Sequence, residues 1–197
     1  MDKKTILDIL VKNGNGYLLT ADAVNADVSR KYLGKYIKEY NMEYVANGLY
    51  LSENGWQDPL FELHIKNKQM YFSHETALHI HGLMEREPNK TEVTVRSNYN
   101  ATHLRKQKVK VYSVKSELFD IGGNTSETNF GNRVSVYDME RTICDIIRYR
   151  NQMDVQVFGT AMKEYASSRS KNIANLGKYA KLFDVQEDVM RYLEVLV

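Results

Sequence analysis

The sequence has little cysteine, little proline and no long apolar run. Cys144 is the only cysteine, so an intramolecular disulfide and a zinc site built from several cysteines are both excluded. No stretch of about 18 apolar residues is present, which excludes a membrane-spanning helix. The opening segment MDKKTILDILVKNG lacks the apolar region and small-residue cleavage site of a signal peptide. These absences predict a cytoplasmic protein without a membrane partner.

Charge is unevenly distributed along the 197 residues. The chain is 43% hydrophobic and 26% charged, as is ordinary for a globular protein, and its net charge is +2. Residues 1–58 hold 7 basic and 8 acidic groups, residues 59–115 hold 10 and 5, and residues 116–197 hold 10 and 12. Residues 96–115 contain six cations and no acid. The middle of the chain is therefore a candidate surface for an anionic partner.

The first 58 residues show a pattern of three short helices followed by a hairpin. Apolar residues at helical spacing begin at Ile6 and stop before Gly14, and Thr20 and Ser29 are suitable N-caps for a second and a third helix. Residues 42–52, MEYVANGLYLS, place two β-rich runs on either side of an Asn-Gly turn. Three helices and a hairpin in this order are typical of a winged helix-turn-helix.

The third predicted helix, residues 30–40, has one cationic face. At about 100° per residue, its four cations share one side and its apolar residues the other. Gly34 lies in the middle of the cationic side, where the missing side chain lets the helix approach a partner closely. Such a helix can enter the major groove of DNA and contact phosphates, and its Ser29 end offers free backbone N–H groups. A solvated helix face is the alternative explanation. The candidate DNA-binding residues are Ser29, Arg30, Lys31, Gly34, Lys35, Lys38 and, in the hairpin turn, Asn47.

A larger second domain is predicted to follow. Asp58 and Pro59 suit the N-cap and first position of a helix, and Ser73 and Gly82 suit the two ends of the next one. The sequence GGNTSETNFGN, residues 122–132, predicts a turn-rich loop. Strands are expected at 92–96, 108–114 and 133–137, and helices at 60–66, 74–81, 139–149, 155–166, 175–183 and 187–196. The expected fold class is α+β, with a winged helix-turn-helix (1–58) and a mixed α/β domain (59–197) whose C-terminal end is helical.

Three of the five histidines fall within eight residues, at His74, His79 and His81. On one helix, His74 and His81 share a face but lie about 10 Å apart along the axis, and His79 points away from His81. Zinc needs ligand atoms about 2.1 Å from a single point, so this spacing does not favour a metal site. Local hydrogen bonds are the expected role, and no metal or other cofactor is predicted.

The segment LRKQKVK, residues 104–110, carries a second group of cations. If it runs as a strand, Lys108 and Lys110 point to one face and Val109 and Val111 to the other. Plain solvation and a functional surface both remain open, and a functional surface would hold DNA flanks or an RNA. The candidate residues of this second basic patch are Arg96, Arg105, Lys106, Lys108 and Lys110.

Asp138, Glu140 and Asp145 form the best acidic cluster of the sequence. A nuclease would use such carboxylates to hold Mg²⁺. A helix start explains them as well, because Asp138 suits an N-cap, Glu140 suits the first turn, and Asp145 lies four residues after Arg141. Cys144 lies in an apolar run and is expected in the core. The sequence therefore favours a protein that is not an enzyme.

Two segments resemble landmarks of the AbiEi antitoxin family. FSHETALHIHGL (72–83) is similar to the family's Ser-x-x-(Ser/Thr)-Ala-Leu-x-x-His-Gly-Leu. SVYDMERTICDII (135–147) is similar to its Glu-Arg-Thr-x-x-Asp, here Glu140, Arg141, Thr142 and Asp145. The hairpin sequence GLYLS also resembles the family's wing, with Asn47 where arginine is common.

The resemblance implies a bacterial type IV toxin–antitoxin system linked to abortive phage infection. Antitoxins of this family repress their own operon by binding inverted repeats in double-stranded DNA upstream of it. Their C-terminal domain counteracts a nucleotidyltransferase toxin without forming a stable complex with it. Two alternatives remain open, each with an accessory DNA-binding module: a nuclease-like C-terminal domain, and an adaptor that binds the toxin directly.

Overall fold

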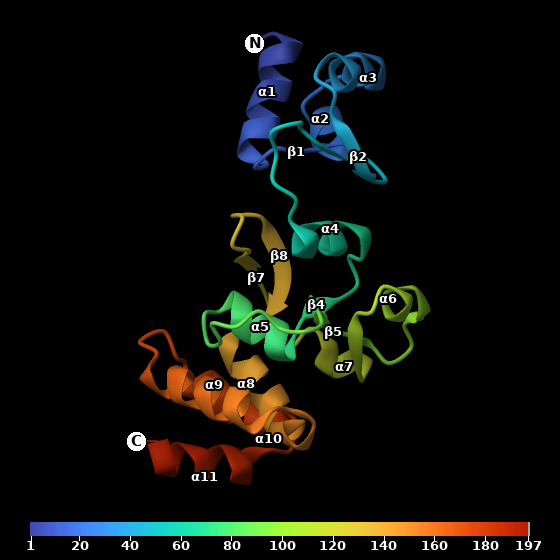
Figure 1. The fold of residues 1–197 in the computed structure, drawn as a ribbon. Coiled ribbons are helices and arrows are strands. Elements are labelled where there is room, and N and C mark those ends of the chain that lie inside the picture. The colour runs from blue at the N-terminus through green and yellow to red at the C-terminus, as the bar shows by residue number, and fades with distance from the viewer. Residues whose placement is uncertain (197) are drawn as a thin grey trace. The chain divides into compact units, whose positions relative to one another are not determined.

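The computed structural model describes residues 1–196, and the chain separates into two compact units (Figure 1). The first unit comprises Met1–Lys68 and Glu127–Val134, and the second comprises Gln69–Ser126 and Ser135–Val197. Helices and strands occur in both units, so the protein is mixed α/β. The predicted boundary between residues 58 and 59 lies inside the first unit, because the helix that Asp58 begins packs against the preceding strands.

The first unit combines four helices with a small sheet. The helices are α1 (Lys3–Asn13), α2 (Thr20–Asn25), α3 (Arg30–Glu39) and α4 (Pro59–Lys66). The strands β1 (Tyr17–Leu19), β2 (Glu43–Ala46) and β3 (Leu49–Leu51) form an antiparallel sheet in the order β1-β3-β2. The predicted helices and hairpin of this region are present, and β1 is a strand that the sequence did not indicate.

Side-chain caps set several helix boundaries in this unit. Ser29 and Asp58 occupy the N-cap positions of α3 and α4 and accept backbone N–H groups, as predicted. Gly48 takes a left-handed φ of 74° in the hairpin turn, a conformation that glycine adopts readily. Thr20 is the first residue of α2 and not its N-cap, because Leu19 takes that position while still pairing with Leu49 in the sheet.

Two apolar clusters stabilise the first unit. The first lies among α1, α2 and α3 and includes the buried residues Leu7, Leu33 and Tyr36. The second joins the sheet to α4, and Phe61 and Ile65 of that helix pack against its three buried members. α4 therefore completes the core of this unit.

The second unit places helices around a five-stranded sheet. The strands are β4 (Tyr71–Phe72), β5 (Glu92–Arg96), β6 (Lys110–Val114), β7 (Gly123–Glu127) and β8 (Arg133–Tyr137), in the order β6-β5-β4-β8-β7. β4 pairs antiparallel with β5 and parallel with β8, and β5 pairs parallel with β6. The helices are α5 (His74–Ile80), α6 (Thr102–Lys106), α7 (Ser116–Phe119), α8 (Met139–Arg148), α9 (Val155–Ser167), α10 (Ile173–Leu182) and α11 (Gln186–Leu196), with a short 3-10 turn at Arg150–Gln152.

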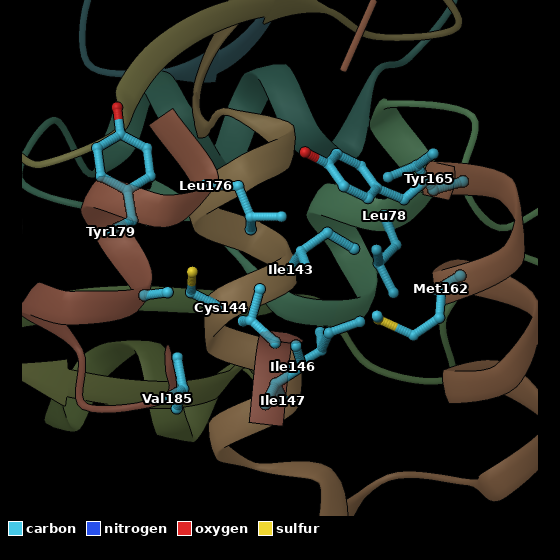
Figure 2. Close-up of a cluster of buried hydrophobic side chains, with 14 of the residues drawn as sticks. Leu78, Ile143, Cys144, Ile146, Ile147, Met162, Tyr165, Leu176, Tyr179 and Val185 are labelled. Atoms are coloured by element: carbon cyan, nitrogen blue, oxygen red, sulfur yellow. The ribbon is translucent and has the colours of Figure 1, made fainter. Parts of the chain in front are cut away.

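The core of this unit is built around α8, which is buried from residue 140 to residue 147. Figure 2 shows Ile143, Cys144, Ile146 and Ile147 of α8 between side chains of α5, α9 and α10. Cys144 is fully buried among them, as predicted, and burial raises the pKa of its thiol to about 12. Such a thiol stays protonated and inert at neutral pH.

Two predictions about this half of the chain are wrong. Part of the loop expected at 122–132 forms β7, because pairing within the sheet compensates for a sequence poor in strand-forming residues. The strand expected from residue 108 begins only at Lys110, because Lys108 adopts a left-handed φ of 62° after α6. None of the helices within residues 1–196 combines the length and apolar content needed to cross a membrane.

Candidate nucleic-acid interface

The exposed side of α3 carries four cations. Arg30, Lys31, Lys35 and Lys38 are all exposed, and within the described chain none of them forms an ion pair. The opposite side is held in the core through Leu33 and Tyr36. The structure therefore brings together the cationic residues predicted from the sequence on one uncompensated surface.

Contacts with α1 hold α3 in place. The Tyr36 hydroxyl donates a hydrogen bond of 2.7 Å to the Asp8 carboxylate, and burial raises the pKa of this phenol above its ordinary value. Lys4 lies 5.4 Å from the centre of the Tyr40 ring. These contacts use the apolar side of α3 and leave its cationic side uninvolved.

Gly34 lies in the middle of the cationic side with open space in front of it. A Cβ atom added there would meet nothing within 4 Å. Glycine inside a helix is less stable than alanine by about 0.5–1 kcal/mol, because it loses more backbone entropy. The open space leaves the backbone of α3 accessible at this position.

The hairpin turn presents a polar side chain beside an exposed aromatic ring. Asn47 is exposed, and its side-chain oxygen accepts a hydrogen bond of 2.9 Å from the Tyr44 hydroxyl. Tyr44 is itself 58% exposed, with its ring edge-on to Tyr50 at 5.8 Å. Tyr44 was not among the residues predicted from the sequence for this surface. Its place opposite Tyr50 in the hairpin is the sequence pattern that would have indicated it.

Two of the five cations of the second basic patch form ion pairs. Arg105, Lys106 and Lys108 are exposed and unpaired in the described structure. Arg96 instead binds Asp120 at 2.7 Å, and Lys110 binds Glu92 at 2.7 Å. Both pairings join strands to residues distant in sequence, which the pattern of cations alone does not place.

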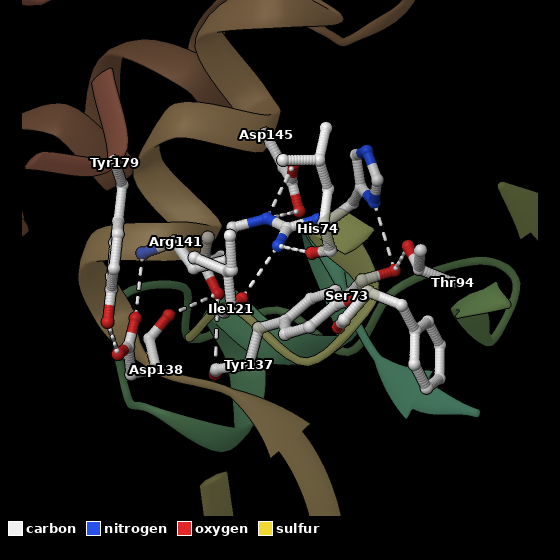
Figure 3. Close-up of polar contacts among 12 residues, drawn as sticks. Ser73, His74, Thr94, Ile121, Tyr137, Asp138, Arg141, Asp145 and Tyr179 are labelled. Carbon is white, nitrogen blue, oxygen red and sulfur yellow. Dashed lines mark hydrogen bonds and ion pairs between the residues drawn. The ribbon is translucent and has the colours of Figure 1, made fainter. Parts of the chain in front are cut away.

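The three clustered histidines make separate local contacts. His79 Nδ1 lies 3.2 Å from the Met84 carbonyl oxygen, and His81 Nε2 lies 2.6 Å from that of Tyr137. His74 is buried at the start of α5, with Nδ1 3.0 Å from the Ser73 hydroxyl. Ser73 occupies the N-cap position, but its hydroxyl is used by His74 and Thr94 and makes no cap bond (Figure 3). In the described residues, no three histidine, cysteine or acidic side chains converge on a point that could hold a metal.

Each carboxylate of the acidic cluster has its own structural partner. Asp138 accepts the Arg141 backbone N–H at 2.8 Å, and Asp145 accepts two bonds of 3.1 Å from the Arg141 side chain (Figure 3). Glu140 accepts bonds from the Tyr165 hydroxyl at 3.1 Å and the Asn172 backbone N–H at 2.6 Å. The predicted helix-start roles thus describe Asp138 and Asp145, whereas Glu140 binds residues of α9 and of the segment before α10.

Comparison with known proteins gives a similarity of fold. No family model matches the chain, and no curated protein sequence matches it. The solved structure of the RV2827C protein from Mycobacterium tuberculosis is similar, with a TM-score of 0.55 and 10% sequence identity. The match covers 97% of this chain and 79% of that one. At this identity the similarity shows the fold alone.

Proposed function

We propose that the first unit is a winged helix-turn-helix that binds double-stranded DNA. In this proposal α3 is the recognition helix and the β2–β3 hairpin is the wing. The observation that carries it is the side of α3 formed by four exposed, unpaired cations around Gly34. A glycine without an internal packing role, placed among cations, suits a helix whose backbone lies close to a polyanion.

The residues of α3 divide into two roles. Arg30 lies in the first turn, the part of a recognition helix that contacts base edges, so it is assigned to base reading. Lys31, Lys35 and Lys38 are assigned to phosphates, together with the backbone N–H groups at the Ser29 end. Asn47 and Tyr44 at the wing would contact the backbone of the flanking DNA.

The proposed biological role is that of an autorepressor and antitoxin in a type IV toxin–antitoxin system. It rests on the resemblance to AbiEi antitoxins, whose two landmark segments fall here on α5 and α8. These helices pack against each other, and the landmark residues Thr76, Arg141 and Asp145 are buried. In this proposal the protein is not an enzyme, and the structural bonds of Asp138, Glu140 and Asp145 support that role. The functional partner in this proposal is a nucleotidyltransferase toxin. Growth of cells that co-express toxin and antitoxin tests whether the chain relieves toxicity. Co-purification from the same cells then distinguishes an antitoxin that forms no stable complex from an adaptor that binds the toxin directly.

DNA binding is tested by substitution at Gly34. Gly34→Glu should reduce affinity for the duplex immediately upstream of the coding sequence at least about ten-fold, because it adds bulk and like charge at the contact. Gly34→Ala separates the two causes, since it adds bulk alone. Both substitutions keep the fold, because the site is open and both residues form helix better than glycine. Gly159→Glu is the matched control, an exposed helical glycine of the second unit that also has open space.

Salt titration distinguishes the two roles on α3. Lys35→Ala and Lys38→Ala should each reduce the slope of log affinity against log salt by about 0.9, as expected for one lost phosphate contact. Arg30→Ala should cost about 1–3 kcal/mol and relax sequence preference at one base pair. If Gly34→Glu and Arg30→Ala both bind like the parent chain, α3 does not enter the groove and the proposal fails.

A further inference from the structure

Four Asn-Gly pairs occur in the sequence, and all of them lie in the first unit. They begin at Asn13, Asn15, Asn47 and Asn54. In such a pair the backbone nitrogen of the glycine can attack the side-chain carbonyl carbon of the asparagine, because the glycine has no Cβ atom to block the approach. The fold then decides which of the four pairs can react.

Hydrogen bonding of the glycine N–H differs among the four pairs. The attacking nitrogen must lose its proton, and a hydrogen bond to a carbonyl oxygen holds that proton in place. The N–H groups of Gly14 and Gly16 donate bonds of 2.9 Å to carbonyl oxygens of α1, and that of Gly55 donates one of 2.8 Å to Ser52. Within the described chain the Gly48 N–H donates no hydrogen bond. Gly48 therefore has the nitrogen that is free to react.

The side chain of Asn47 is open to solvent, and its carbonyl group is polarised. Asn47 is exposed, so the water that the reaction consumes can reach it. The Tyr44 hydroxyl donates a hydrogen bond of 2.9 Å to Asn47 Oδ1. Attack on the carbonyl carbon places negative charge on this oxygen, and a donor at that position stabilises the tetrahedral intermediate. Tyr44 thus contacts the atom on which charge develops.

We propose that the Asn47-Gly48 pair is a site of self-modification, at which the amide of Asn47 becomes a carboxylate. The Gly48 nitrogen loses its proton to solvent and bonds to Asn47 Cγ, and the side-chain nitrogen leaves as ammonia. The five-membered imide that results adds one water molecule, which opens it to aspartate or to isoaspartate. The net change is from amide and water to carboxylate and ammonium, and no other reactant is consumed.

Either product places a negative charge at the turn between β2 and β3. Its effect on DNA rests on the proposed function, in which this hairpin is the wing that contacts the DNA backbone. Repulsion between the new carboxylate and the phosphates should lower the affinity for duplex DNA as the chain ages. The working lifetime of one repressor molecule is then limited by the chemistry of its own wing.

Peptide mapping of the full chain by mass spectrometry tests the site. During incubation in mildly alkaline buffer, Asn47 should convert at least about five-fold faster than Asn13, Asn15 or Asn54, since each of those pairs must first break a hydrogen bond. These three pairs are internal controls, and conversion of any of them as fast as Asn47 overturns the proposal. Tyr44→Phe should slow the conversion of Asn47 several-fold, whereas an unchanged or faster conversion refutes the role of the hydroxyl.

Affinity for duplex DNA separates this inference from the proposed function. An aged sample of the parent chain should bind the duplex upstream of its coding sequence several-fold more weakly than a fresh sample, and fresh Asn47→Asp should reproduce the loss. Asn47→Gln is the matched control, because its amide would have to close a larger ring, so its aged and fresh samples should bind alike. An aged parent chain that is converted at Asn47 and binds like the fresh chain overturns the effect on DNA. Failure of the proposed function appears instead as parental binding by Arg30→Ala and Gly34→Glu, and leaves the mass-spectrometric result unaffected.

Discussion

The environment of His74 differs strongly from that of a free side chain. It is buried with a left-handed φ of 49°, and its ring stacks on Tyr112 with centroids 3.5 Å apart. Within the described structure Nε2 has no hydrogen-bond partner. Burial, with Lys110 and Arg141 nearby, holds the pKa of His74 well below its ordinary value. The folded protein therefore keeps this imidazole neutral where the unfolded chain would protonate it.

The depressed pKa of His74 predicts a loss of stability in mild acid. Below the unfolded pKa of about 6.5, only the unfolded chain binds the proton, so the free energy of unfolding falls by up to about 1.4 kcal/mol per pH unit. His74→Asn should reduce this slope by the share of one proton, since asparagine tolerates left-handed φ and does not titrate. Urea denaturation at a series of pH values from 7.5 to about 5 measures it. His103→Asn, at an exposed histidine of the same unit, is the control, and equal slopes for parent and His74→Asn would refute the prediction.

At the scale of an element, α8 carries a buried ion pair, Arg141–Asp145, that also connects this helix to other segments of the second unit. Arg141 binds Asp145 one turn later and donates to the carbonyl oxygens of Leu118 at 3.0 Å and Ile121 at 2.7 Å. Its guanidinium lies 4.1 Å from the centre of the Tyr137 ring. The i, i+4 pair was predicted from the sequence, whereas the carbonyl acceptors come from a segment about twenty residues away.

Replacing only one partner of this ion pair should lower the free energy of unfolding much more than replacing both partners. Arg141→Met leaves the Asp145 carboxylate buried without its partner, and should reduce the free energy of unfolding by about 3–5 kcal/mol. The double variant Arg141→Met/Asp145→Leu removes both charges and should recover much of that loss. Thermal and urea denaturation followed by circular dichroism provide the comparison. A double variant no more stable than Arg141→Met would show that the carbonyl contacts of the guanidinium, and not the ion pair, dominate.

At the scale of the whole molecule, the chain order does not follow the division into units. Asp58 caps α4 and also accepts hydrogen bonds from Thr128 at 2.5 Å and Asn132 at 2.9 Å. The segment 127–134 thus returns to the first unit from the middle of the second. A division at residue 58 separates α4 from the sheet against which Phe61 and Ile65 pack.

Cutting the chain between residues 58 and 59 should therefore damage both pieces. The 59–197 fragment should expose the apolar side of α4, bind a hydrophobic dye and melt at a lower temperature than the full chain. Residues 1–58 alone should lose stability as well, because the Tyr17–Leu49–Leu51 cluster loses its cover. A 59–197 fragment that melts like the full chain without dye binding would contradict this.

The sequence by itself determined the features that depend on near neighbours. Caps at Ser29, Asp58 and Asp138, the hairpin turn at Gly48 and the single cationic face of α3 are fixed by spacing along one element, so periodicity and turn chemistry suffice to find them. The buried setting of Cys144 followed in the same way from the apolar run around it.

Only the tertiary structure decided the features that depend on distant partners. β7 is a strand because it lies beside β8, and not because its residues favour one. The ion pairs of Arg96 with Asp120 and of Lys110 with Glu92 likewise depend on how the chain folds. The open space in front of Gly34 and Gly177 likewise depends on the fold, because packing decides which side of each helix faces solvent. Pairing, burial and solvent exposure are properties of the folded chain, since each is set by residues that local sequence does not place.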